Sequence, residues 1–180
     1  MPMLPPVPAA PAVPHPMTGQ PRAVLLKPLV TSPLTEDEDF SRYGDPDGPS
    51  SFETRNVLYP YGPERLATGK FRAPGEGVRS IMSGTDHRVD APSAFPFPIT
   101  GGPWSDHGDL RGDLPGRGDT VVGHDVRSGC RPTMLSGVRL GHGAIVAAAT
   151  RRRRDEESAA APITSNIRAV GDLLARWTGG

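Results

Sequence analysis

The sequence predicts an all-β domain of the parallel β-helix class, assembled from hexapeptide rungs, with one long extruded loop and a short C-terminal α-helix. Three observations lead to this prediction: a six-residue repeat over residues 122–146, a weaker repeat of the same kind over residues 68–82, and a segment without any period between them. A period of six fits neither the 3.6-residue α-helix nor the two-residue alternation of a strand. It fits a coil with three short flat faces, in which each rung is buried only by stacking on its neighbours.

The tract at residues 122–146 carries the repeat most clearly. It reads VGHDVR, SGCRPT, MLSGVR and LGHGAI, and Val146 opens a fifth unit. An aliphatic residue opens four of these five units, and the residue four positions later is compact in every complete unit. We expect the opening side chain to point into the prism. The glycine that follows it in three units is expected to take the corner conformation that a side chain would resist.

The repeat at residues 68–82 is recognisable but damaged. Thr68 and Pro74 stand where the repeat places aliphatic residues, and Arg72 falls at a position that faces inward. An unpaired charge in a narrow apolar prism costs on the order of several kcal/mol. The sequence therefore predicts a polar interior in this part of the coil.

The composition is that of one soluble globular domain. The chain has 180 residues, with 20 Lys and Arg against 20 Asp and Glu. This balance of charge indicates neither nucleic acid nor a membrane surface as a partner, and no apolar run approaches the roughly 20 residues of a membrane helix. The single cysteine, Cys130, excludes an intrachain disulfide framework and is typical of a reducing compartment. We therefore expect a cytoplasmic protein.

Three regions are expected along the chain. Residues 1–22 contain eight prolines and are predicted to form a disordered tail. Residues 23–150 are predicted to form the β-helix domain, in which the acidic stretch at residues 35–39 is exposed. Residues 151–180 are predicted to be a helical segment, because their apolar residues recur at spacings of three and four.

The extruded loop, residues 83–120, is far longer than an ordinary connection, and such excursions are more often functional than idle. It holds His87, with Asp86 and Asp90 nearby. A neutral imidazole near pH 7 can accept a proton from a substrate hydroxyl, and a neighbouring carboxylate can orient it. From the residues alone, an ordinary histidine of a surface loop explains His87 better.

His124 and His142 are 18 residues apart, which is three rungs or one full coil. We expect them to stack on one face at the strand spacing of about 4.8 Å. With His107 or His87 they would make a three-histidine zinc site, so a zinc-dependent hydrolyase is one alternative for the function. Both occupy the third position of a rung, which is usually outward and hydrophilic. Two surface residues are therefore the simpler interpretation, and no metal is expected.

A set of short motifs spread over residues 23–149 points to a family. They are YPY at 59–61, GEGV at 75–78, IMSG at 81–84, HR at 87–88, FPF at 95–97, GDTVVGHDV at 118–126 and GVRLGHGAIV at 137–146. In this combination the chain resembles the streptogramin A (virginiamycin-type) O-acetyltransferases and the related hexapeptide-class chloramphenicol acetyltransferases. The block IMxGxxHR with FPF nearby is specific within hexapeptide proteins, whereas the rungs alone are not.

The resemblance implies a fold, an assembly and a reaction. The family forms homotrimers of left-handed β-helices, with acetyl-CoA along the coil and a hydroxylated antibiotic beneath the extruded loop, between subunits. His87 matches the family's catalytic histidine, a general base on the acceptor hydroxyl that works without an acyl-enzyme. The positions that match binding residues are Tyr43, Tyr61, Phe95 and Phe97 for the acceptor, and Gly129, Ala147 and Ala148 for the cofactor.

The chain also departs from the family pattern. Arg42 stands where the family has a tyrosine, Asp86 where asparagine usually precedes the catalytic histidine, and Arg127 where a rung tryptophan is expected. The last coil, with its Gly-Asn-Pro-Ala-Lys turn, is missing between residues 150 and 151, so we expect a divergent, truncated relative. These departures leave a second hypothesis open, in which a degenerate, inactive trimer serves only as a scaffold.

Overall fold

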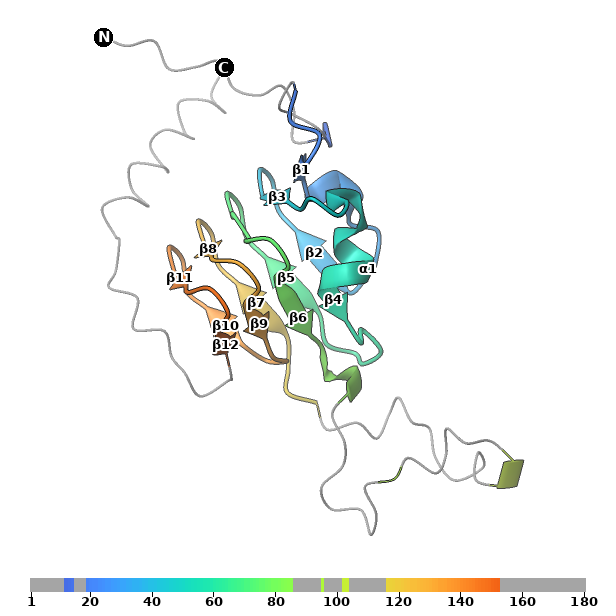
Figure 1. Cartoon of the computed structure of the whole chain (residues 1–180). Helices are drawn as coiled ribbons and strands as arrows, with labels where there is room; N and C mark the ends of the chain where they lie inside the picture. Colours follow the sequence, from blue (N-terminus) through green and yellow to red (C-terminus); the bar gives the residue numbers. More distant parts are fainter. Residues whose placement is uncertain (1–11, 15–18, 86–94, 96–101, 104–115, 153–180) are drawn as a thin grey trace, which may run out of the picture.

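The computed structural model describes residues 12–14, 19–85, 95, 102–103 and 116–152 (Figure 1). Within these residues the chain forms mostly short strands in parallel sheets, with few helical turns. The strands are β1 (Ala23–Leu25), β2 (Thr35–Asp37), β3 (Arg42–Gly44), β4 (Val57–Leu58), β5 (Leu66–Thr68), β6 (Arg79–Ile81), β7 (Thr120–Val122), β8 (Arg127–Ser128), β9 (Thr133–Met134), β10 (Arg139–Leu140), β11 (Ile145–Val146) and β12 (Arg151–Arg152). The helical elements are α1 (Phe52–Asn56) and the 3-10 turns η1 (Lys27–Leu29), η2 (Pro49–Ser51) and η3 (Ser83–Thr85).

Three parallel sheets receive the strands in rotation. One sheet has the order β10-β7-β5-β2, the second has β12-β9-β6-β4, and the third pairs β11 with β8. From β7 to β12, successive strands enter the three sheets in turn, so the chain returns to the same sheet after three strands. The pairs Val121–Arg139 and Thr133–Arg151 are each 18 residues apart. This register confirms that three rungs make one coil. The last paired strand, β12, begins at Arg151, just past the domain boundary expected at residue 150.

Side chains of the repeat face inward as the period predicts. Ser128 opens a unit without an aliphatic side chain, and its hydroxyl instead accepts a hydrogen bond from the backbone N–H of Gly75 at 2.9 Å. The other opening residues are buried, as are the compact residues four positions later: Val122, Met134, Leu140 and Val146, then Val126, Pro132, Val138 and Ala144. The damaged tract keeps the same register, because Thr68 pairs with Val122 and Ser80 pairs with Met134.

The corner conformation falls on a different residue from the one expected. Positive φ angles recur every sixth residue at the fourth position of each rung: 54° at Asp125, 55° at Arg131, 74° at Gly137, 71° at Gly143 and 54° at Ala149. The prediction that the second-position glycines take this conformation was wrong. At Gly123 and Gly129 glycine is needed because the next coil lies too close for a side chain, whereas no described atom lies within 4 Å of a Cβ on Gly141. A Cβ on Gly123 would lie 2.8 Å from the backbone nitrogen of His142.

The acidic stretch at residues 35–39 is not wholly exposed, which corrects the sequence-based expectation. It contains β2, in which Thr35 and Asp37 point inward and Glu36 points outward. The alternation of a strand therefore places one of these carboxylates in the interior.

An antiparallel pair, β1 with β3, covers the end of the stack near β2 and α1 (Figure 1). Val24 and Leu26 are fully buried there, and the rings of Tyr43 and Phe52 meet edge to face with centroids 4.9 Å apart. The apolar start of the domain thus closes one end of the core.

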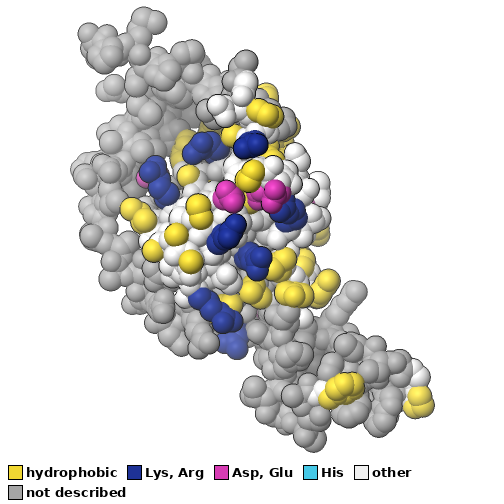
Figure 2. Space-filling model, viewed as in Figure 1, with side chains coloured by type: hydrophobic (Ala, Val, Ile, Leu, Met, Phe, Trp, Pro, Cys, Tyr) yellow, Lys and Arg dark blue, Asp and Glu magenta, His cyan; other side chains and the backbone are white. Residues whose placement is uncertain are grey.

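Outward positions of the parallel strands carry basic side chains. Arg79, Arg139 and Arg151 are exposed on β6, β10 and β12. Figure 2 shows Lys and Arg side chains spread across the face seen in Figure 1, between apolar patches and a small acidic group. No helix among the described residues is long and apolar enough to cross a membrane. The helix expected after residue 151 and most of the proline-rich tail lie outside the described residues.

Candidate functional site

Both ends of the extruded loop are tied to the preceding coil. The backbone N–H of Met82, just before η3, donates to the carbonyl of Leu58 at 2.9 Å. At the other end the backbone N–H of Thr120, in β7, donates to the carbonyl of Arg65 at 2.9 Å. Several residues proposed for chemistry lie outside the described residues: His87, Phe97, Asp86, Asp90 and His107. Their roles stay predictions.

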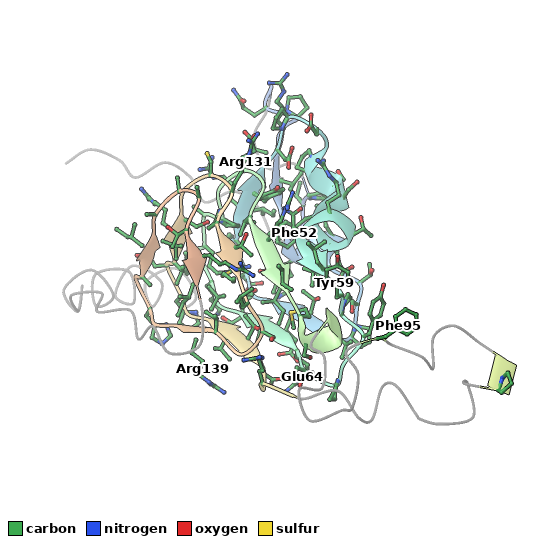
Figure 3. All side chains as sticks on the ribbon, turned by 60° about the horizontal axis from the view of Figure 1, so that its bottom comes forward. Phe52, Tyr59, Glu64, Phe95, Arg131 and Arg139 are labelled. Carbon is green, nitrogen blue, oxygen red and sulfur yellow. The ribbon has the colours of Figure 1, made fainter. Side chains whose placement is uncertain are left out.

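Exposed aromatic side chains mark the start of the loop. Tyr61 is 63% exposed, and its Cδ2 lies 3.0 Å from the position that a Cβ on Gly84 would take, so its ring rests on η3. Tyr59 and Phe95 are exposed too, and Figure 3 shows them on the same side of the molecule. Aromatic surface of this kind binds the apolar parts of a ligand. Tyr61 and Phe95 are therefore available for the contact predicted for them.

Tyr43 lies in the core rather than on a surface. It is only 1% exposed, and its hydroxyl donates to Asp45 at 2.7 Å while accepting from the Asn56 side chain at 3.0 Å. Burial, reinforced by the neighbouring carboxylate, raises the pKa of Tyr43. The hydrogen bond from Tyr43 lowers the pKa of Asp45 below its ordinary value. Direct contact between Tyr43 and an acceptor does not fit this burial, and the residue instead supports the fold at this end of the stack.

The residues predicted to hold the cofactor are small and lie where two coils approach. The backbone N–H of Gly129 donates to the carbonyl of Val146 at 2.8 Å. A Cβ on Gly129 would lie 2.6 Å from the backbone nitrogen of Ala148, so a side chain has no room. Ala147 and Ala148 follow β11 and are exposed. An extended ligand can approach the backbone closely along such a surface.

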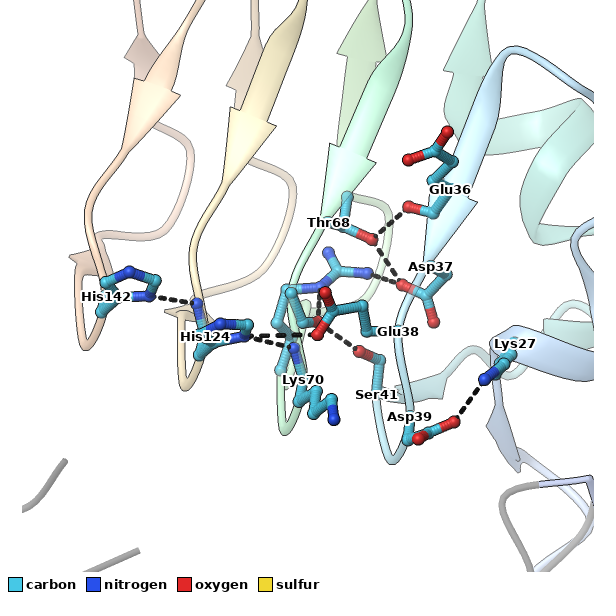
Figure 4. Close-up of polar contacts among 12 residues, drawn as sticks. Lys27, Glu36, Asp37, Glu38, Asp39, Ser41, Thr68, Lys70, His124 and His142 are labelled. Carbon is cyan, nitrogen blue, oxygen red and sulfur yellow. Dashed lines mark hydrogen bonds and ion pairs between the residues drawn. The ribbon is translucent and has the colours of Figure 1, made fainter. Parts of the chain in front are cut away.

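His124 and His142 stack as predicted. Their ring centroids are 4.6 Å apart and their planes differ by 14°. The Nδ1 atom of His142 accepts a hydrogen bond from the backbone N–H of His124, and the Nδ1 atom of His124 accepts one from the backbone N–H of Lys70, both at 2.9 Å (Figure 4). Among the described residues no group of three or more His, Cys, Asp and Glu is placed to hold a metal ion. Each imidazole thus accepts a hydrogen bond from the backbone of the neighbouring coil.

A buried ion pair crosses the interior of the damaged tract. The side chains of Arg72 and Asp37 are 6% and 2% exposed, and the guanidinium contacts the carboxylate (Figure 4). Thr68 donates to Asp37 at 2.6 Å, and Arg72 donates to the carbonyl of Gly69 at 3.2 Å. Burial raises the pKa of Asp37 against the effect of the nearby Arg72 charge, and burial lowers the pKa of Arg72. The inward position of Arg72 was the signal in the sequence that a carboxylate had to lie opposite it.

The comparisons with known proteins agree on an enzyme class. No protein-family model matches the chain. The chain is 44% identical over 84 residues to a probable macrolide acetyltransferase of Lysinibacillus sphaericus, covering 47% of each chain. It is 34% identical over 128 residues to a chloramphenicol acetyltransferase of Agrobacterium fabrum, covering 69% of this chain and 61% of the relative. It is 36% identical over 105 residues to a virginiamycin A acetyltransferase of Staphylococcus aureus, covering 57% and 47%.

The chain thus spans less than two thirds of the length of these relatives, from 47% to 61%. The resemblance found in the motifs is confirmed, since the matched proteins include both of the acetyltransferase types that it named. The chain is homologous, over part of their length, to macrolide, chloramphenicol and virginiamycin A acetyltransferases.

Proposed function

We propose that the protein is an acetyl-CoA-dependent O-acetyltransferase that acts on a hydroxyl of a small molecule of the antibiotic class. The observation that carries the proposal is the set of relatives. Three proteins named for different antibiotics, a macrolide, chloramphenicol and virginiamycin A, are all acetyltransferases. The shared element in these names is the transferred acetyl group, and the acceptor varies. The choice of acceptor for this chain is therefore the open part of the proposal.

The fold that we propose for this activity is a left-handed parallel β-helix assembled as a homotrimer. Two observations support the helix: strands that return to the same sheet every 18 residues, and a positive φ at every sixth residue from Asp125 to Ala149. The trimer matters for chemistry because the family places its sites between subunits. Residues from two copies would then complete each site.

His87 is the proposed general base. Its imidazole takes the proton from the acceptor hydroxyl while that oxygen forms a bond to the carbonyl carbon of the thioester. When the tetrahedral intermediate collapses, the carbon–sulfur bond breaks, and the departing thiolate takes the proton back from the imidazolium. The acetyl ester and free coenzyme A are released, and the histidine is restored. No covalent intermediate with the protein is needed.

The acceptor and the cofactor would meet different surfaces of the chain. Tyr61 and Phe95, both exposed, and Phe97 are the proposed contacts for the acceptor. The surface of small residues at Gly129, Ala147 and Ala148 is the proposed place for coenzyme A. Both surfaces are accessible in the described part of the chain, except for Phe97, which lies outside it.

The test is an acetylation assay with purified protein, acetyl-CoA and three acceptors: streptogramin A, chloramphenicol and a macrolide. Release of the coenzyme A thiol together with an acetylated product supports the proposal. His87→Ala is expected to abolish the reaction while leaving the oligomeric state unchanged. Turnover at the wild-type rate in that variant would remove His87 from the mechanism.

An inactive scaffold is the second candidate, favoured by the polar residues Thr68, Arg72 and Ser80 in the rung interior. A ligand that binds the folded state raises its stability by RT ln(1 + [L]/Kd). A thermal-shift titration with coenzyme A separates the two candidates. No stabilisation at millimolar ligand, combined with no acetylation of any acceptor, would favour the scaffold.

A further inference from the structure

Glu64 is a buried carboxylate just before β5, at a position where no motif in the sequence predicts a functional residue. It is 7% exposed, and its Oε2 accepts a hydrogen bond from the hydroxyl of Ser83, which is itself 1% exposed. Ser83 is the first residue of η3 and of the extruded loop. Figure 3 shows Glu64 at the same end of the molecule as η3. The departing end of the loop is therefore held by a buried hydrogen bond.

The returning end of the loop lies close to the other oxygen of the same carboxylate. A Cβ on Gly116 would lie 2.6 Å from Oε1 of Glu64. On the departing side, a Cβ on Gly62 would lie 2.7 Å from the hydroxyl oxygen of Ser83. Neither glycine has a positive φ. A side chain at either position would displace the Glu64 carboxylate or its Ser83 partner from this arrangement.

The next residue, Arg65, continues this attachment. Its backbone N–H donates to Asp119 at 2.8 Å, and its carbonyl accepts from the backbone N–H of Thr120 at 2.9 Å. Two consecutive residues, Glu64 and Arg65, therefore hold both ends of the loop. Ser83 and Gly116 are 33 positions apart in the sequence, yet both lie beside one carboxylate.

We propose that Glu64 is a positioning residue for acetyl transfer, because it bonds to the departing end of the segment that carries the general base and lies close to the returning end. The proposal rests on the proposed function, in which His87, four residues after Ser83, takes the proton of the acceptor. A misplacement of about 1 Å in a reacting group can lower the rate by about 100-fold. Glu64 touches neither substrate in this scheme and acts only through its hydrogen bond to Ser83 and its position beside Gly116.

The experiment compares four variants in the full-length protein. Glu64→Ala and Ser83→Ala break the anchor, and Glu64→Gln keeps an acceptor of the same shape. Glu36→Ala is the matched control, because it removes an exposed carboxylate that pairs with Arg65 at 2.9 Å but does not touch the loop. Two quantities are measured: hydrogen–deuterium exchange of peptides covering residues 82–85 and 116–120, and the kcat and KM for acetyl-CoA.

For Glu64→Ala we expect faster exchange at both loop ends and a kcat lower by between about 10-fold and 100-fold, with the KM for acetyl-CoA within about 2-fold of wild type. Ser83→Ala should change the exchange rate and kcat in the same direction as Glu64→Ala. Glu64→Gln should stay near wild type in both quantities. Glu36→Ala should change neither. If Glu64→Ala exchanges faster throughout the stack because it unfolds, Ser83→Ala and Glu64→Gln decide the question. A lower kcat with an unchanged KM for acetyl-CoA is not expected if Glu64 only stabilises the fold.

Unchanged exchange at residues 82–85 and 116–120 in Glu64→Ala and Ser83→Ala overturns the anchor. Faster exchange with an unchanged kcat overturns the positioning role and leaves a structural contact only. If the wild-type protein acetylates none of the acceptors, the proposed function fails, and the positioning role fails with it. The exchange data still report separately whether the anchor exists, so the two failures are distinguishable.

Discussion

The imidazole of His142 accepts a hydrogen bond from the backbone N–H of His124, 18 residues earlier and one coil away. The same arrangement repeats one coil further on, where His124 accepts from the backbone N–H of Lys70. A nitrogen that accepts a hydrogen bond carries no proton, so each ring holds its proton on Nε2. The two side chains thus bridge three successive coils along one corner. They add side-chain hydrogen bonds to the backbone ladders that hold the stack.

Replacing His142 should show that the acceptor atom matters more than the ring. In His142→Asn the amide oxygen is attached at Cγ, as Nδ1 is, and can accept the same backbone N–H. His142→Ala loses the bond and should lower the free energy of unfolding by about 0.5–1.5 kcal/mol. Thermal unfolding should place the Asn variant near wild type and the Ala variant a few degrees lower. Arg139→Ala, at an exposed position on β10, is the control. Equal losses in the Asn and Ala variants would assign the stabilisation to ring stacking instead.

Tyr43→Phe should reveal a dependence of stability on pH. The hydroxyl of Tyr43 lowers the pKa of Asp45 below its ordinary value of 3.8, so the bond favours the ionised carboxylate of the folded protein. Such a group stabilises the fold above its unfolded-state pKa, and that stabilisation is lost as the pH falls through the folded-state pKa. The variant keeps the ring contact with Phe52 and loses only the hydroxyl.

At pH 7 the loss should be about 1.5–3 kcal/mol, the range for hydrogen bonds to charged groups. The difference between the two proteins should shrink as the pH falls below about 3.8. Urea unfolding between pH 2 and pH 7 measures it. A gap between the two proteins that is constant across this range would show that the hydroxyl does not act through the ionised form of Asp45.

The ion pair of Arg72 and Asp37 should behave as a unit. Removing one partner leaves a buried charge unpaired and costs about 3–5 kcal/mol. Replacing both, in Asp37→Leu with Arg72→Met, leaves an apolar interior and is expected to be close to neutral or stabilising. Unfolding free energies of the single variants Asp37→Leu and Arg72→Met and of the double variant form a double-mutant cycle. If the double variant is destabilised by the sum of the two single losses, the pair is not coupled.

The six-residue period was sufficient to predict which side chains face inward, including Arg72, because burial in a coil is a local property of the rung. The partner of Arg72 was not predictable from that period. Asp37 lies 35 residues away in β2, within an acidic stretch that has no repeat, so only the pairing of β2 with β5 brings them together. Glu64 was missed for the same reason, since its two neighbours come from opposite ends of the extruded loop. The position of the positive φ within the rung was predicted wrongly because glycine occurs for two different reasons. It permits a left-handed backbone, and it permits two coils to approach closely, and the sequence does not distinguish these reasons.

Substitutions of two glycines at the second position of a rung, Gly129 and Gly141, can distinguish these two reasons for glycine. Neither Gly129 nor Gly141 has a positive φ. A Cβ on Gly129 would lie 2.6 Å from the backbone nitrogen of Ala148 and 2.8 Å from its Cα, and backbone cannot move aside as a flexible side chain can. Around Gly141 no atom of the described residues lies within 4 Å of such a Cβ. The same substitution therefore meets a neighbouring coil at one site and open space at the other.

Gly129→Ala should lower the free energy of unfolding by about 1–3 kcal/mol, the usual loss for overpacking. Gly141→Ala should leave it unchanged or raise it by about 0.4–1 kcal/mol, because alanine restricts the unfolded chain. Thermal and urea unfolding of the two variants side by side make the comparison. If left-handed backbone were the reason for glycine at this position, both variants would be destabilised alike. A loss of unfolding free energy in Gly129→Ala without a loss in Gly141→Ala would instead show that glycine is needed where one coil stacks directly on the next.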